Sequence, residues 1–132
     1  MSNPLEGKKV LVIEDIAENM RLLRAVLRLE GANILEATRA PAGIELAQQH
    51  IPDIILMDLQ MPEMDGLTAT RILREDPRTR DIPIIAVTAS VMERDRAQIL
   101  AAGCDGYVPK PINPDTFAQE IVLFAQAKHA SG

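Results

Sequence analysis

The stretch Ile54-Ile55-Leu56-Met57-Asp58-Leu59-Gln60-Met61-Pro62 decides the fold class of this chain. Four apolar residues run directly into an aspartate, and a proline ends the run soon afterwards. A continuous apolar run this short is typical of a strand buried on both faces of a parallel sheet. An acidic residue directly after such a strand lies at the carboxyl edge of the sheet, where open α/β folds place their ligands. Taken alone, Asp58 is more often a solvated loop carboxylate, so the interpretation depends on its companions.

The composition limits the class of protein. The 132 residues, 47% hydrophobic and 25% charged, suffice for one ordinary globular domain. A net charge of −5 argues against a nucleic-acid partner, which usually meets a basic face. The single cysteine, Cys104, excludes an intramolecular disulfide and a zinc site built from several thiolates. Because we find no signal region and no apolar run long enough to span a bilayer, we expect a cytoplasmic protein without a membrane partner.

Strand and helix patterns alternate along the whole chain. We predict strands over residues 8–13, 33–37, 54–58, 83–87 and 106–108, and helices over 17–30, 38–50, 66–75, 90–102 and from 114 onward. Thr38, Asp65, Ser90 and Asn113 are the predicted helix caps, and Pro114 is the predicted first residue of the last helix. Five βα units predict a doubly wound parallel sheet with helices on both faces. We expect a lead-in over 1–7, one domain over 8–127 and a tail over 128–132.

Polar and charged side chains follow four of these strands. Glu14 and Asp15 follow the first strand, Asp58 closes the third, Thr88 follows the fourth, and Lys110 lies in the loop after the fifth. In a parallel sheet all of these strand ends lie on one edge. Each residue has an ordinary alternative, such as a helix-start pair, a cap or a surface lysine, but together they form a specific pattern.

The chemistry of this cluster favours a metal ion and a phosphoryl group. Carboxylates 4 Å apart repel by about 1 kcal/mol in water and about 4 kcal/mol at an effective dielectric constant of 20. A bound hard cation or a proton relieves this repulsion, and carboxylates with waters and a phosphate suit Mg²⁺. Lys110 and the Thr88 hydroxyl can then contact an anion. Such a site is suited to moving a phosphoryl group onto Asp58.

At this point the sequence resembles a known family, the receiver domain of two-component response regulators, which has the CheY-like, flavodoxin-like fold. The resemblance covers roughly residues 8–127. It rests on motifs in the correct order: Val10-Leu-Val-Ile-Glu-Asp15, Leu56-Met-Asp-Leu-Gln-Met-Pro62 with Asp65-Gly66, Ile85-Ala-Val-Thr-Ala89, and Gly103-Cys-Asp-Gly-Tyr-Val-Pro-Lys-Pro111. It implies a three-layer sandwich with strand order 2-1-3-4-5.

The resemblance also implies a role for each site residue. Asp58 is the implied phosphoacceptor, and Asp15, Asp58 and the backbone carbonyl of Gln60 are the implied Mg²⁺ ligands, with Glu14 acting through water. Lys110 contacts the phosphoryl group, and Thr88 moves to form a hydrogen bond with it. Tyr107 changes its rotamer together with the movement of Thr88. The Lys110-Pro111 bond is expected to be cis. Ile16 departs from the polar residue that many relatives have after the acidic pair. Gln60 and Ser90 stand at variable positions that influence the phosphoryl lifetime in the family, which leaves that lifetime open.

The implied function is a phosphorylation switch with protein partners. A histidine kinase or a phosphotransfer protein would donate a phosphoryl group to Asp58. A protein target would bind the face made by helix four, strand five and helix five. The protein would not be an enzyme beyond its own Mg²⁺-dependent phosphorylation and dephosphorylation. Because the chain ends after the fifth helix, we expect a stand-alone regulator; the alternatives are a receiver excised from a hybrid histidine kinase and a constitutive interaction module.

Two further hypotheses come from the residues themselves. An enzyme on a related fold is disfavoured: a phosphatase would show a second aspartate two residues after the first, where Ala17 stands, and a flavin carrier would need more aromatic residues. The first helix has an apolar side wider than core packing requires. We therefore hypothesise that Leu22 or Leu29 stays partly exposed and helps to dock a helical partner, with Asn19 near the site.

Overall fold

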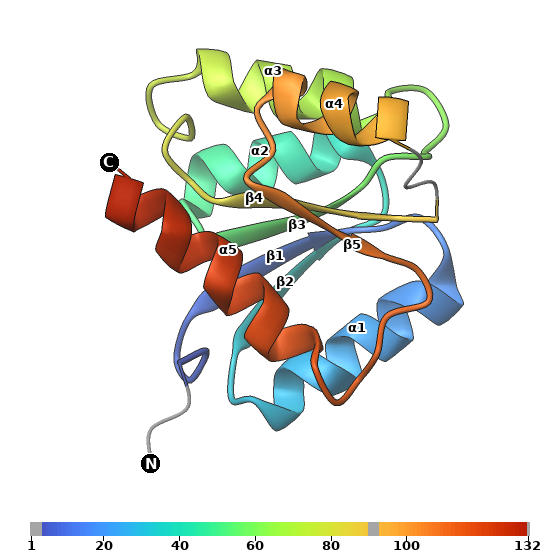
Figure 1. Ribbon diagram of the computed structural model, residues 1–132, viewed down its shortest axis with the longest axis vertical. Helices are drawn as coiled ribbons and strands as arrows, with labels where there is room; N and C mark the ends of the chain where they lie inside the picture. The colour runs from blue at the N-terminus through green and yellow to red at the C-terminus, as the bar shows by residue number, and fades with distance from the viewer. Residues whose placement is uncertain (1–3, 90–92, 132) are drawn as a thin grey trace.

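The computed structural model describes residues 4–89 and 93–131 of the chain (Figure 1). Within these residues, strands and helices alternate from end to end. The strands are β1 (Lys9–Ile13), β2 (Asn33–Ala37), β3 (Ile54–Asp58), β4 (Ile84–Thr88) and β5 (Gly106–Pro109). The helices are α1 (Ala17–Leu29), α2 (Ala40–His50), α3 (Gly66–Glu75), α4 (Glu93–Ala102) and α5 (Phe117–Ser131).

The strands form one parallel sheet in the order β2-β1-β3-β4-β5, which confirms the predicted fold class. The register pairs Ile13 with Met57, Asp58 with Val87, and Thr88 with Pro109. Four neighbouring strands therefore end at nearly the same level. The residues that follow them share one edge of the sheet, as the sequence predicts.

Helices cover both faces of the sheet (Figure 1). One core lies between the sheet and helices α1 and α5; its buried members include Val12, Leu27, Leu56 and Phe117. The other lies between the sheet and α2, α3 and α4; its buried members include Leu11, Ile44, Leu73 and Ile99. Every residue of β3 and β4 is buried, which is the pattern that a continuous apolar run predicts for central parallel strands.

The helix starts agree only partly with the predicted caps. The Asp65 carboxylate accepts a hydrogen bond from the Thr68 amide at 2.8 Å, which confirms Asp65 as the cap of α3. Helix α2 begins at Ala40, with Arg39 at the N-cap position and no side-chain cap, so the predicted role of Thr38 is wrong. The predicted cap Ser90 lies outside the described residues.

Helix α5 starts later than the sequence predicts. The Asn113 side chain accepts a hydrogen bond from the Asp115 amide at 3.0 Å, and the Asn113 carbonyl accepts from both Thr116 and Phe117. These bonds make a separate turn of residues 114–116, so the helix begins at Phe117 and not at Pro114. It continues to Ser131, through most of the predicted tail. In the described part of the chain, α5 and the other helices are too short or too polar to cross a membrane.

Candidate functional site

Glu14, Asp58 and Lys110 converge because of strand alternation. Each comes two residues after a strand residue that packs in the core shared with α1 and α5. Side chains two residues apart on a strand point to the same face. The three side chains therefore gather at the carboxyl edge of the sheet, on the α1 side, although 96 residues separate Glu14 from Lys110.

The lysine lies between the two buried carboxylates. Lys110 Nζ donates a hydrogen bond to Glu14 Oε1 at 2.7 Å, and it lies 3.6 Å from Asp58 Oδ1. Glu14 is only 1% exposed and Asp58 only 4%. The backbone amide of Gln60 donates to Asp58 Oδ1 at 3.1 Å. Asp58 Oδ1 thus faces one cation and one amide, and the Glu14 and Asp15 carboxyls lie beside the same carboxyl group.

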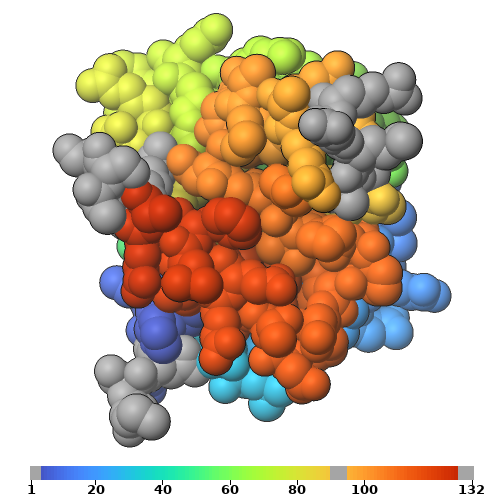
Figure 2. Space-filling model, in the orientation of Figure 1, coloured from blue at the N-terminus to red at the C-terminus, as the bar shows by residue number. Residues whose placement is uncertain are grey.

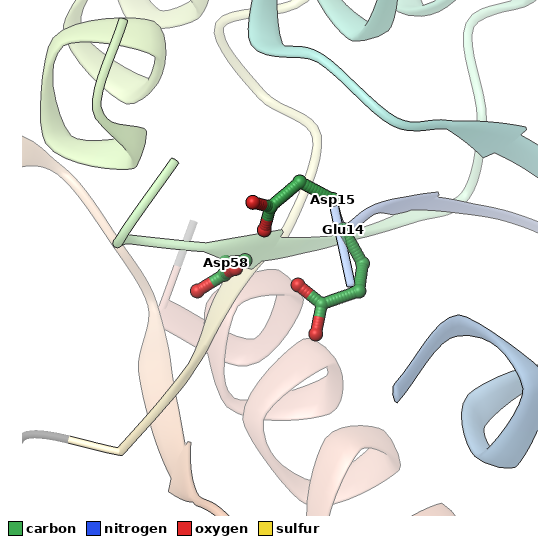
Figure 3. Close-up of side chains that lie close together, drawn as sticks. All are labelled: Glu14, Asp15 and Asp58. Carbon is green, nitrogen blue, oxygen red and sulfur yellow. The ribbon is translucent and has the colours of Figure 1, made fainter. Parts of the chain in front are cut away.

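Asp15 completes an acidic cluster with Glu14 and Asp58. Figure 3 shows the three carboxylates around one space, and one oxygen from each lies within 4.8 Å of the others. Glu14 Oε2 and Asp15 Oδ1 are buried and receive no hydrogen bond within the described parts of the chain. A buried carboxylate oxygen without a donor is costly, so these atoms call for a cation or bound water. Three oxygen ligands of this kind fit Mg²⁺.

Burial and the neighbouring carboxyls raise the pKa values of two members of the cluster. Burial, followed by the neighbouring Glu14 carboxyl, raises the pKa of Asp58 to about 6, although the Gln60 amide and Lys110 act in the opposite direction. Burial and the neighbouring Asp58 also raise the pKa of Asp15. The lysine and the amide therefore only partly offset the burial of Asp58 and its neighbouring carboxyl, and a divalent cation would favour the ionised form further.

Thr88 and Tyr107 lie on the other face of the sheet, toward α4. Both share a face with Ala86, Thr88 by strand alternation and Tyr107 by pairing in register. Thr88 is buried and lines a pocket of about 130 Å³ between the β3–α3 loop and α4, together with Gln60 and other residues. The Lys110 amide donates to the Thr88 carbonyl at 2.9 Å, which ties the end of β4 to the loop that carries the lysine. The Lys110-Pro111 bond is cis, as expected.

Two arginines near the site were missed by the sequence analysis. The Arg96 guanidinium of α4 lies 5.5 Å from the centre of the Tyr107 ring, a cation–π contact. Arg39, after β2, forms an ion pair with Glu63 in the β3–α3 loop. In the sequence both arginines look like ordinary solvated residues, and only the fold reveals their partners. The predicted site residues at the strand ends do lie at the carboxyl edge of the sheet: Glu14, Asp15, Asp58, Thr88 and Lys110.

A buried carboxylate lies beside a lysine and an acidic cluster at the carboxyl edge of a five-stranded parallel sheet, which defines a class of α/β domain whose site can hold a cation and an anion together. The sequence model of the "Response regulator receiver domain" family matches residues 10–122, most of the chain. The protein therefore belongs to the response regulator receiver domain family.

Comparison with individual proteins agrees with this assignment. The chain is 40% identical to the polar-differentiation response regulator DivK of Brucella anthropi over 114 residues, which are 86% of this chain and 93% of that protein. It is 31% identical to the receiver domain of the sensor histidine kinase PA1611 of Pseudomonas aeruginosa PAO1, with a TM-score of 0.84 and coverage of 91% and 98%. That crystal structure has a magnesium ion coordinated in its active site cleft. The chemotaxis regulator CheY4 of Vibrio cholerae, at 24% identity and a TM-score of 0.85 over 89% and 98% of the two chains, shares the fold.

Proposed function

We propose that this protein is a phosphorylation switch that accepts a phosphoryl group on Asp58. The observation that carries the proposal is the surroundings of that carboxylate: it is buried at the sheet edge, near Lys110, and beside two buried carboxylate oxygens that have no donor among the described residues. This arrangement resembles no solvated loop aspartate. It combines a nucleophile, a point-charge partner for an anion and a place for a cation.

In the proposed reaction, an oxygen of the Asp58 carboxylate attacks the phosphorus atom of a phosphohistidine on a partner protein. A P–O bond forms, the P–N bond breaks, and the imidazole leaves with the bonding electron pair and then takes a proton from water. The attacking oxygen must be deprotonated, and the Gln60 amide and Lys110 both favour that form. The product is an aspartyl phosphate at the sheet edge.

The proposed metal ligands are Asp15, Asp58 and the Gln60 carbonyl, with Glu14 acting through water. When bound there, Mg²⁺ would supply charge neutralisation for the transferred phosphoryl oxygens. The chain itself contributes by positioning the carboxylates that would bind the metal ion. β1 and β3 end side by side and bring the carboxylates together, and the hydrogen bond from Gln60 to Asp58 fixes the carboxylate relative to the start of the β3–α3 loop.

Lys110 is the proposed anion contact, and Thr88 and Tyr107 are the proposed switch. In the structure, Lys110 is paired with Glu14 but only 3.6 Å from Asp58, so a small side-chain movement would take its ammonium to a phosphoryl oxygen. Thr88 would donate its hydroxyl to the same group, and Tyr107 would follow into the space beside α4. Thr88 is buried and Tyr107 is half-buried on the same face of the sheet, which supports a coupled movement of the two side chains.

The proposed target surface is the face of α4, β5 and α5, which Figure 2 shows toward the viewer. Leu100 of α4 is exposed one helical turn after Arg96, whose guanidinium contacts the Tyr107 ring, and Tyr107 lies on β5 between the two helices. A change at Thr88 and Tyr107 would alter this face directly. For the phosphodonor we propose the side of α1, where Leu22 and Leu29 are 37% and 86% exposed.

The deciding experiment is incubation with Mg²⁺ and acetyl phosphate, followed by intact mass measurement. We expect one phosphoryl adduct that requires Mg²⁺ and is absent in Asp58→Asn. Lys110→Met should bind Mg²⁺ and yet form the adduct more slowly. A folded wild-type protein that neither binds Mg²⁺ nor gains an adduct would overturn the proposal in favour of a constitutive interaction module.

A further inference from the structure

An ion pair crosses the sheet edge beside the acidic cluster. Arg39 follows β2, and its side chain reaches Glu63 in the loop between β3 and α3. Because β1 lies between β2 and β3 in the sheet, a contact between these two loops must pass the end of β1. That strand end is where Glu14 and Asp15 begin. The pair therefore borders the proposed metal site without belonging to it.

Glu63 has an unusual backbone conformation. Its φ angle is +71°, and among the described residues the only other non-glycine residue with a positive φ is Ile51. A glutamate disfavours this left-handed conformation, because its Cβ comes close to the following carbonyl oxygen. Such a residue persists where its surroundings hold it in place. The side-chain interaction that can hold Glu63 in this conformation is its contact with Arg39.

The loop that Glu63 belongs to carries part of the site. It includes Gln60, whose amide binds Asp58 and whose carbonyl is a proposed metal ligand. Met61 anchors the loop by packing into the core between the sheet and helices α2, α3 and α4. The Met64 amide bonds the Pro62 carbonyl at 2.8 Å, so the segment turns within itself. Glu63 lies at the outer side of this turn, with its side chain 56% exposed, where only Arg39 ties it to another element of the described structure.

We propose that the Arg39–Glu63 ion pair is a strap that positions the β3–α3 loop for metal binding. This inference rests on the proposed function, because it concerns the same site. Arg39 and Glu63 are positioning residues: they hold the turn after Gln60, and through it the direction of the Gln60 carbonyl. Loss of either partner frees the loop, and the site then needs more Mg²⁺ to reach the same occupancy.

A charge effect without a strap predicts a different pattern. Removal of the Arg39 cation would strengthen cation binding at a nearby acidic cluster, and removal of the Glu63 anion would weaken it. Under the strap, Arg39→Ala and Glu63→Ala both weaken Mg²⁺ binding, and the exchanged pair, Arg39→Glu with Glu63→Arg, restores much of it. The signs of the two single variants therefore distinguish the explanations.

The test measures adduct formation with acetyl phosphate over a range of Mg²⁺ concentrations, together with Mg²⁺ binding by calorimetry. For each single variant we expect the half-saturating Mg²⁺ concentration to rise about two- to fivefold, as the strength of an exposed ion pair implies. The rate at saturating Mg²⁺ should stay the same. Amide hydrogen exchange of residues 60–64 in metal-free protein should speed up in both single variants and slow again in the exchanged pair.

The matched control is the Arg24–Glu36 ion pair, which joins α1 to β2 away from the proposed site. Arg24→Ala and Glu36→Ala should leave the Mg²⁺ dependence and the loop exchange unchanged. Wild-type protein that binds no Mg²⁺ and gains no adduct would overturn the proposed function. A functional wild type whose Arg39 and Glu63 variants match it, or shift in opposite directions, would overturn the strap alone.

Discussion

Lys110 Nζ lies nearer to Glu14 than to Asp58, at 2.7 Å from Glu14 Oε1 and 3.6 Å from Asp58 Oδ1. In this state the lysine mainly neutralises the most deeply buried carboxylate of the site. The proposed phosphoacceptor is therefore only partly compensated, and its pKa is raised to about 6 in spite of the nearby cation.

Lys110→Met should destabilise the metal-free protein. The substitution keeps the length of the side chain but leaves Glu14, which is almost fully buried, without its cation. Because an uncompensated buried charge is costly, we expect a loss of about 2–3 kcal/mol, somewhat below the range for a fully buried pair. Urea unfolding at pH 7.5 measures it. Lys8→Met, at an exposed lysine, is the control, and adding Glu14→Gln to Lys110→Met should recover part of the loss.

The stability of the metal-free protein should fall between about pH 4 and pH 7 relative to Asp58→Asn. The folded-state pKa of Asp58, about 6, lies above its unfolded value of about 3.9, so the folded protein binds more protons in this window. The stability contributed by the protonated carboxyl is complete below pH 4 and is lost as the pH passes 6. The shift corresponds to about 3 kcal/mol. Parallel curves for the two proteins across this range would contradict the raised pKa.

Gly66→Ala should displace the backbone of Asp58 at the end of β3. A Cβ added at Gly66 would lie 2.5 Å from the Asp58 carbonyl oxygen and 2.9 Å from the Leu59 Cα. Both are backbone atoms, so the first turn of α3 or the end of β3 must shift, at a cost of about 1–3 kcal/mol. We expect a lower melting temperature and slower adduct formation.

Gly7→Ala is the comparison for this prediction. Among the residues that the structure describes, nothing lies within 4 Å of its added Cβ, although its φ of +75° makes alanine mildly unfavourable. It should lower stability a little and leave phosphorylation unchanged. Equal phosphorylation rates in Gly66→Ala and wild type would show that the α3 contact does not position Asp58.

Ile51→Gly should stabilise the protein. Ile51 ends α2 with φ of +45°, a left-handed conformation that a β-branched residue strongly disfavours. Its side chain is exposed, so little burial is lost. After the entropy cost of glycine, we expect a gain of about 0.5–1 kcal/mol in thermal or urea unfolding. Ile16→Gly, at an exposed isoleucine with φ of −88°, should instead be destabilising.

Leu22→Ala tests the proposed docking side of α1. The side chain is 37% exposed, so its truncation should cost well under the 2–5 kcal/mol of a buried leucine. Phosphotransfer from a histidine phosphotransfer protein should slow, while phosphorylation by acetyl phosphate should not. A loss of stability with unchanged phosphotransfer would assign Leu22 to the core and end the docking hypothesis.

The sequence was sufficient for the fold because the informative patterns are local. Short apolar runs such as 54–57 are typical of central parallel strands, and the acidic or hydroxyl residues that follow the first, third and fourth runs mark the carboxyl edge. The strand order came from the family resemblance, because periodicity alone does not say which strands are neighbours. The structure confirms that order and brings Glu14, Asp58 and Lys110 together.

What the sequence did not predict depends on long-range contacts or on competing local bonds. Arg39 and Glu63, and Arg96 and Tyr107, pair across loops and elements that only the folded chain brings close. The start of α5 was placed too early because Pro114 is also compatible with the separate turn that Asn113 stabilises. The extra exposure of Leu22 and Leu29, by contrast, followed from the width of the apolar side of α1, and the structure confirms it.

The position of Tyr107 gives this protein an internal optical reporter. The chain contains one tyrosine and no tryptophan, so its intrinsic fluorescence comes from a single ring. That ring lies on β5 against the Arg96 guanidinium of α4, at the surface proposed to respond to phosphorylation. Emission intensity and its quenching by iodide therefore follow the environment of this one side chain in unlabelled protein. If the proposed switch moves this ring, its movement can be followed in real time without a dye, a tag or an added chromophore.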